Sequence, residues 1–312
     1  MRKEKLPELR PPKPHEIGEN RQVSMSNALV RASHSLLLSE KRLIMLGVAN
    51  TDQDKPIEGN YGWIVTIHAS EYSRRFGVNI DTAYDQLRSA SKKLFSRYVR
   101  GIWWNKPNCA DGRYQTDEIY FRWISSATYL KDEGSVMLNF TPELVPHLIE
   151  LKREFTKYKL KSTCLFESVY TWRLYELLLS YVSQQPHKEF TIHEFKLLMD
   201  TPPSLDTNFG LLRVNVIETA VKEINEKSDL KILEVKKDNK GNSVFFESFK
   251  TGKKITSIKF YFKKDEQLKI DLPKPSAKPK IYTKDDLDRN SALARPGETY
   301  EQALRRLNAN KK

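Results

Sequence analysis

Residues 207–264 read TNFGLLRVNVIETAVKEINEKSDLKILEVKKDNKGNSVFFESFKTGKKITSIKFYFKK, and this stretch decides the fold. Its first part repeats apolar residues at helical spacing, which predicts an amphipathic helix with one buried stripe. The stripe consists of Leu212, Val216, Ile217, Ala220, Val221 and Ile224. The opposite face carries Asn215, Glu218, Thr219 and Lys222. One face is therefore expected to pack, and the other to meet a ligand or solvent.

Two strand patterns follow this helix. One strand is expected over residues 230–235 and another over residues 255–262, where apolar side chains alternate. Residues 236–242 combine lysines with Asp, Asn and Gly, which are typical of a turn. A helix followed by a basic hairpin predicts a winged helix, whose wing lysines would lie beside a duplex backbone.

A second helix pair is predicted nearer the N-terminus. Residues 69–76 and residues 81–98 both show helical spacing, and a glycine separates them, as in a helix-turn-helix. The longer helix has an apolar face and a polar face, and the polar side chains could reach base edges or phosphates. That polar face consists of Thr82, Asp85, Gln86, Ser89, Lys92, Lys93 and Ser96.

Strand patterns follow this helix over residues 98–104 and 117–124, and the loop between them is the candidate first wing. The order of two helices and a hairpin therefore occurs twice. We predict an α+β fold with two tandem winged-helix domains, each a helix-turn-helix plus a β-hairpin wing, and with flexible basic tails. The expected divisions are a leader over residues 1–23, domains over 24–152 and 153–264, and a Pro/Lys linker with a short tail helix over 265–312.

Charge points to a polyanionic partner. The 312 residues include 53 lysines and arginines against 40 aspartates and glutamates, which gives a formal net charge of +13 and a pI near 9.4. Such a chain gains affinity for nucleic acid through counterion release. The sequence has no apolar run long enough for a membrane span and no signal-peptide core, so a cytoplasmic location is expected.

No residues with the spacing of an enzyme or a metal site stand out. The two cysteines, Cys109 and Cys164, are far apart and form no Cys-x-x-Cys pair, which argues against a zinc site or a disulfide framework. The six histidines include no pair flanking one hydrophobic residue, as a rolling-circle nickase needs, and no Walker loop is present. We therefore expect no catalytic residue, no metal and no cofactor.

Several short motifs in order resemble the Rep_3 family of plasmid replication initiators, over roughly residues 24–264. The motifs are Asn27-Ala28-Leu29, Leu38 to Leu43, Ser168 to Leu178, Ala220 to Asn225 and Ser228 to Leu230. The resemblance implies binding to directly repeated origin sequences (iterons), local opening of the duplex, and recruitment of the host initiator and the replicative helicase. It also implies a homodimer, formed largely through the N-terminal domain, that represses its own promoter at an inverted repeat.

The residues expected to contact double-stranded DNA lie on two helices and two hairpins. In the second domain they are Asn208, Arg213, Asn215, Thr219, Lys222, Lys236, Lys237 and Lys240; in the first they are Thr82, Gln86, Ser89, Lys92, Lys93, Arg97, Lys106 and Arg113. By position, Arg213 matches a basic cluster of the family. A regular helical wheel places it over the apolar stripe, so it can face DNA only if the first turn projects beyond the core.

Other interpretations remain open at this point. The charged helix faces could be ordinary solvated surfaces, which is the commonest fate of charged residues. The same helices would also serve a transcriptional regulator with no role in replication. A nicking enzyme with an unfamiliar arrangement of its site is the alternative from another class.

Overall fold

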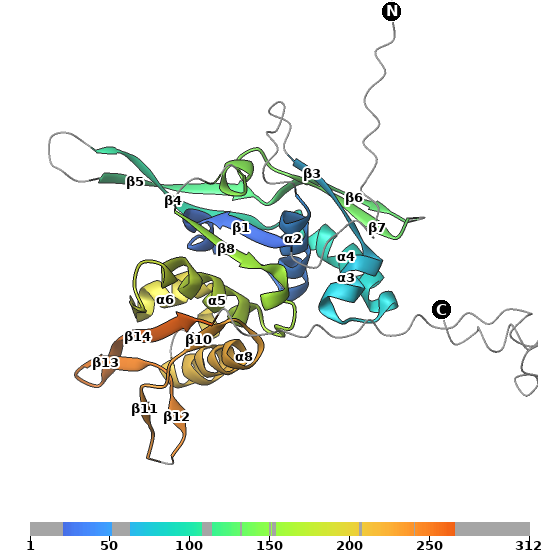
Figure 1. Cartoon of the computed structure of the whole chain (residues 1–312). Coiled ribbons are helices and arrows are strands. Elements are labelled where there is room, and N and C mark those ends of the chain that lie inside the picture. The colour runs from blue at the N-terminus through green and yellow to red at the C-terminus, as the bar shows by residue number, and fades with distance from the viewer. Residues whose placement is uncertain are drawn as a thin grey trace, which may run out of the picture.

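The computed structural model describes residues 21–51, 63–107, 114–131, 133–149, 151, 154–205, 208–239 and 241–265. The expected tail helix and all but the end of the expected leader lie outside these ranges. Figure 1 shows two groups of helices and strands, one above the other. Each group contains its own small sheet, so the expected fold of two winged-helix units is confirmed.

The N-terminal unit has one helix, one strand, two further helices and a hairpin. Its elements are α2 (Leu38–Asn50), β3 (Trp63–His68), α3 (Ala69–Phe76), α4 (Ile80–Leu94), β6 (Ile124–Leu130) and β7 (Ser135–Phe140). The strand order is β3-β7-β6. Helix α3 ends at Gly77, whose φ of 64° lies in the left-handed region that glycine adopts without strain. The expected helix over residues 81–98 ends earlier, because Tyr98 already begins a strand.

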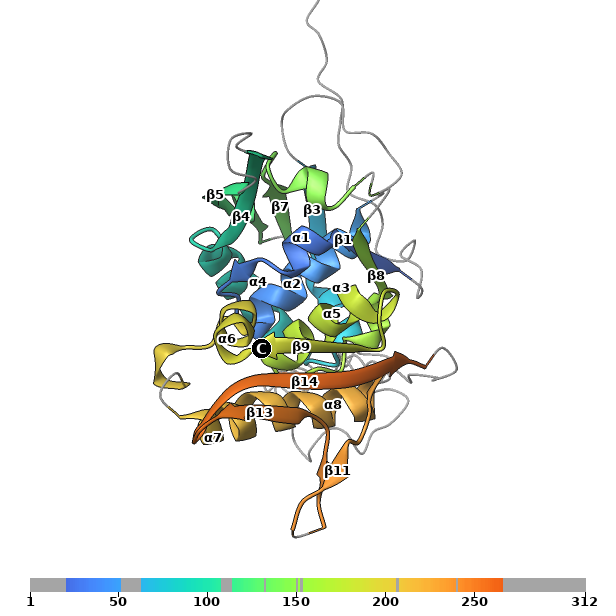
Figure 2. The same cartoon turned by 90° about the vertical axis from the view of Figure 1, so that its left-hand side faces the viewer.

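The C-terminal unit repeats this order. Its elements are α5 (Val169–Val182), β9 (His187–Thr191), α6 (Ile192–Met199), α7 (Phe209–Leu212), a π-helical segment (Arg213–Glu218), α8 (Thr219–Lys227), β13 (Glu247–Thr251) and β14 (Lys254–Lys264). We call the continuous run from α7 to α8 the recognition helix. The strand order β9-β14-β13 is the same as that of the first unit, and Figure 2 shows β14 between its two neighbours.

Each unit also carries strands inserted between its last helix and its final hairpin. They are β4 (Tyr98–Pro107) and β5 (Tyr114–Arg122) in the first unit, and β10 (Leu230–Ile232), β11 (Lys236–Lys237) and β12 (Ser243–Val244) in the second. Strands β4 and β5 form a separate sheet with β2 (Ser33–His34), and β11 pairs only with β12. The β4-β5 hairpin is the one that the sequence pattern offered as the first wing. For the second wing, the expected strands over residues 230–235 and 255–262 do pair, as β10 and β14, and the β11-β12 hairpin lies in the connection between them.

The wing assignment is therefore corrected. In a winged helix, the wing hairpin belongs to the sheet that contains the unit's first strand. That condition selects β6-β7 in the first unit and β13-β14 in the second. Strand β13 was not among the expected strands, although it pairs with β14 across the short turn at Gly252 and Lys253.

The remaining elements include a two-stranded sheet that joins the two halves of the chain. Strand β1 (Gln22–Ser26) pairs with β8 (Phe155–Lys159), and the short elements are α1 (Asn27–Val30), η2 (Val145–His147), η3 (Leu160–Ser162) and η4 (Pro203–Leu205). The last two residues of the expected leader, Gln22 and Val23, belong to β1. Strands β1 and β8 lie on opposite sides of the expected boundary after residue 152 and pair with each other. The boundary itself stays a prediction.

A buried polar cluster holds α2 against α5. The Lys41 ammonium lies 2.7 Å from the Glu176 carboxylate, and both side chains are almost fully buried. The Tyr158 hydroxyl donates to the same carboxylate at 2.6 Å and accepts from Trp172 Nε1 at 3.1 Å. Burial lowers the pKa of Lys41, whereas Glu176 opposes the shift. The charges are thus paired inside the protein, as buried charges need to be.

Candidate nucleic-acid interface

The recognition helix separates a packed face from an exposed face as its sequence predicts. All six residues of the expected apolar stripe are buried. Asn215, Thr219 and Lys222 are exposed. Asn208 caps the N-terminus, since its side-chain oxygen accepts from the Gly210 amide at 2.7 Å. The side-chain oxygen of Asn208 is thereby used within the helix, whereas the side chains of Asn215, Thr219 and Lys222 project from it.

The π-helical segment explains why a regular wheel misplaces Arg213. A π-helix has more residues per turn than an α-helix, so side chains within it shift around the axis. The Arg213 side chain is 46% exposed, although Leu212 and Val216 beside it are buried. Its Nε donates to Glu218 Oε1 at 2.6 Å. Arg213 therefore joins the exposed face.

Two exposed apolar side chains on this helix were not singled out in the sequence. Val214 is 55% exposed and Leu211 is 45% exposed. Apolar side chains on a helix that enters the major groove can contact thymine methyl groups. Neither residue belongs to the apolar stripe, and this position in the sequence already indicated that both side chains would be exposed.

Two hairpins of the C-terminal unit carry exposed lysines. Lys236 and Lys237 are exposed on β11, and Figure 1 shows the β11-β12 hairpin projecting from the lower unit. The wing itself carries Lys250, Lys253 and Lys254, all exposed and all missed by the sequence analysis. The missed signal was local, because Thr251-Gly252-Lys253 between two alternating patterns is typical of a hairpin turn.

Helix α4 exposes most of its predicted contacts. Thr82, Ser89, Lys92 and Lys93 are exposed. Gln86 is partly buried and accepts a 2.9 Å hydrogen bond from the Tyr72 hydroxyl. Its side-chain oxygen is thus engaged inside the unit, and four of these five positions face outward.

Arg97 has an internal partner. Its Nε donates to Glu40 Oε2 at 2.9 Å and its Nη2 donates to Oε1 at 3.2 Å. Glu40 is fully buried and also accepts from the Leu37 amide at 2.9 Å. A buried carboxylate without a cation would be costly. Arg97 therefore neutralises Glu40, and we remove it from the set of proposed DNA contacts.

Three predicted contacts cannot be placed. Arg113 and Lys240 lie outside the described residues, and so does the side chain of Lys106. Among the described residues, no group of three or more His, Cys, Asp or Glu could hold a metal ion. None of the described helices combines the length and apolar character that a membrane span requires.

Comparison with known proteins places the chain. The description "Initiator Replication protein, WH1" matches residues 22–179, and "Initiator Rep protein, WH2" matches residues 191–262. The chain belongs to the Rep_3 family of replication initiators. Two Escherichia coli proteins are similar to it: a "Replication initiation protein", 26% identical over 72% of this chain and 68% of the relative, and a "PI protein", 24% identical over 80% and 85%.

A solved structure has the same fold. It is described as Pi initiator protein in complex with iteron DNA, and it superposes with a TM-score of 0.62. The match covers 80% of this chain and 100% of that chain at 21% identity. The Rep_3 chain thus shares the two-unit fold with an initiator that was captured on DNA.

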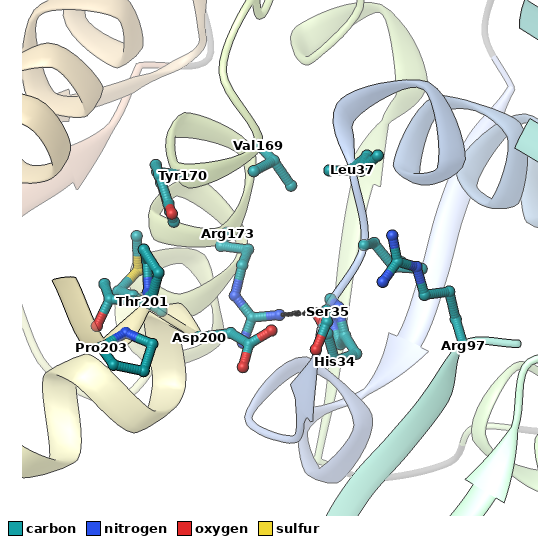
Figure 3. A pocket seen from close by; sticks show the side chains of 13 residues that line it. His34, Ser35, Leu37, Arg97, Val169, Tyr170, Arg173, Asp200, Thr201 and Pro203 are labelled. Carbon is teal, nitrogen blue, oxygen red and sulfur yellow. Dashed lines mark hydrogen bonds between the residues drawn. The ribbon is translucent and has the colours of Figure 1, made fainter. Parts of the chain in front are cut away.

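A pocket of the Rep_3 chain is lined by residues of both units, among them His34 and Arg173 (Figure 3). Arg173 of α5 donates from Nη1 to His34 Nδ1 at 2.8 Å, from Nη2 to Ala32 O at 3.2 Å and from Nε to Leu198 O at 2.9 Å. Burial, and then the charge of Arg173, lower the pKa of His34 well below its ordinary value. His34 is therefore neutral and accepts at Nδ1. The donors of Arg173 point into the protein, so none of these three is offered to a ligand.

Proposed function

We propose that this Rep_3 chain is a non-catalytic initiator that binds directly repeated origin sequences through its C-terminal unit. The observation that carries the proposal is the surface of that unit. One helix stands on a buried stripe and exposes Arg213, Asn215 and Lys222, and two hairpins of the same unit carry exposed lysines. A helix with polar side chains can read base edges in the major groove, while hairpin lysines contact phosphates.

Helix α4 is the second proposed contact. Lys92 and Lys93 are exposed near its C-terminal end, and Thr82 and Ser89 are exposed along it. These short side chains can donate to phosphates or base edges. Each unit then needs its own segment of major groove, and successive grooves on one side of B-DNA are about 10–10.5 bp apart.

The relatives support a role in replication. The Pi initiator, which shares the fold, was captured with iteron DNA, and a similar Escherichia coli protein is a replication initiation protein. From the family we further propose local opening of the duplex, recruitment of the host initiator and the replicative helicase, and a homodimer that represses its own promoter. A transcriptional regulator without a replication role would use the same surface, so the test must include replication.

The first experiment is a footprint over the DNA that flanks the gene of this protein. We expect two protected patches on one face of the duplex, spanning about 20 bp, within directly repeated sequences. About eight phosphate contacts imply a log–log salt slope near −7. Deleting those repeats should abolish plasmid replication. If the protein protects the repeats but their deletion does not affect replication, only the role of a transcriptional regulator is supported.

The second experiment tests the absence of catalysis. Pure protein is incubated with supercoiled origin DNA and Mg²⁺. A non-catalytic initiator leaves the circles supercoiled after protein is removed, whereas a nickase relaxes them. Relaxed circles would overturn this part of the proposal.

A further inference from the structure

We propose that Glu218 determines DNA specificity by positioning Arg213. Its carboxylate accepts from Arg213 Nε, so that the Nη1–Nη2 edge is left for a guanine. The inference rests on the proposed function, because it assumes that the recognition helix enters the major groove. It assigns a role to an acidic residue on a surface that otherwise attracts DNA.

The pair depends on the π-helical segment. In a regular α-helix, residues five apart point about 140° away from each other, since each residue turns the helix by about 100°. Side chains on such a helix meet at spacings of three and four. Arg213 and Glu218 are five apart and yet lie 2.6 Å from each other. Thr219 Oγ1 also contacts Val214 O across five residues, at 2.9 Å.

Stability is a weak reason for this ion pair. Arg213 and Glu218 are 46% and 45% exposed, and ion pairs at such sites contribute little to folding. The pair does, however, fix a flexible side chain before DNA arrives. A guanidinium held in advance loses less rotamer freedom on binding, which favours a two-bond contact to guanine O6 and N7.

Glu218 also explains how wrong sequences would be rejected. A carboxylate in the groove faces phosphates and base acceptors, so it weakens binding to every duplex. At a guanine, Arg213 bonds the base while it still neutralises Glu218. At another base this two-bond contact is lost, but the repulsion between the Glu218 carboxylate and the duplex still weakens binding. Discrimination of this kind comes from repulsion as well as attraction.

The test is Glu218→Gln in the full chain. We expect tighter binding to unrelated DNA, because a negative charge has gone, and a drop of about tenfold in the ratio of specific to non-specific affinity. Glu226→Gln is the matched control, since Glu226 is exposed near the end of α8 and loses the same charge. The control should tighten non-specific binding and keep the ratio.

A double-mutant cycle separates positioning from a general charge effect. In an Arg213→Ala background, Glu218→Gln should leave the ratio unchanged, because there is no guanidinium to position. An unchanged ratio in the parent background, or the same drop in both backgrounds, would overturn the inference while the proposed function stands. If the unmodified chain shows no sequence preference, both the inference about Glu218 and the proposed function are overturned. Circular dichroism on each variant confirms that the helix is retained.

Discussion

The two wings have the same place in the fold and different surroundings. Gly134 in the β6-β7 turn and Gly252 in the β13-β14 turn both have positive φ, at 58° and 62°. A Cβ at Gly134 would lie 2.3 Å from Tyr84 Cε1 of helix α4. A Cβ at Gly252 would meet no described atom within 4 Å. The first wing is folded onto its own helix, and the second stands free.

Charge follows the same division. The free wing carries Lys250, Lys253 and Lys254. The turn of the packed wing reads Lys131-Asp132-Glu133, so its net charge is negative. Topology thus decides where a wing lies, whereas side chains decide whether it can reach a duplex. We infer that the C-terminal unit supplies most phosphate contacts.

The largest effect is expected where the two units meet. Lys41→Met leaves the Glu176 carboxylate buried without its cation, which should lower the free energy of unfolding by about 3–5 kcal/mol. Urea denaturation followed by tryptophan fluorescence measures this loss. Adding Glu176→Leu should restore most of the stability, because the charge is gone. A double variant as unstable as the single one would contradict the explanation.

The wings can be compared directly by neutralising their lysines. Replacing Lys250, Lys253 and Lys254 with Gln should make the log–log salt slope less negative by about two to three, since each phosphate contact contributes about 0.9. Lys131→Gln in the first wing is the matched variant and should leave the slope nearly unchanged. A change of about 0.9 in Lys131→Gln, the same per lysine as in the second wing, would remove the distinction between the wings. Binding titrations at several salt concentrations supply both slopes.

The packing difference predicts unequal effects of alanine at the two wing glycines. Gly134→Ala should destabilise by about 1–3 kcal/mol, because the new methyl group overlaps the Tyr84 ring. Gly252→Ala should lower the free energy of unfolding by about 1 kcal/mol, because the new methyl group adds only the strain of a positive φ. Thermal unfolding of both variants ranks them. A larger loss at Gly252 would show that the first wing does not depend on Tyr84.

The smallest expected effect concerns Arg97. Arg97→Gln should lower stability by about 1–2 kcal/mol, because buried Glu40 loses a charged partner but keeps a hydrogen-bond donor. DNA affinity and the salt slope should not change. Lys93→Gln, near the end of helix α4, is the control. It should leave the free energy of unfolding unchanged and make the log–log salt slope of DNA binding less negative. A slope change in Arg97→Gln would return that residue to the interface.

Local patterns predicted the helices well and the wings poorly. The apolar stripe from Leu212 to Ile224 depends only on spacing within one helix, and it is buried as expected. The place of each wing in its sheet depends on β3 pairing with β7 and β9 with β14, which no local pattern encodes, whereas the turn of the β13-β14 hairpin is a local signal. The partner of Arg97 was not anticipated for the same reason, since Glu40 lies 57 residues away. Arg213 was misplaced because a regular wheel cannot anticipate a π-helical segment.

Strand β14 is the last element of the described chain and the centre of its sheet, where β9, β13 and β10 all pair with it. During synthesis, the recognition helix therefore leaves the ribosome before the strand that completes its unit. Because domains fold as units, the nascent chain has no finished sheet until residue 264 has emerged. Truncated translation products that end before β14 should remain unfolded in this half. They would then be cleared by proteases instead of competing with the complete protein for DNA.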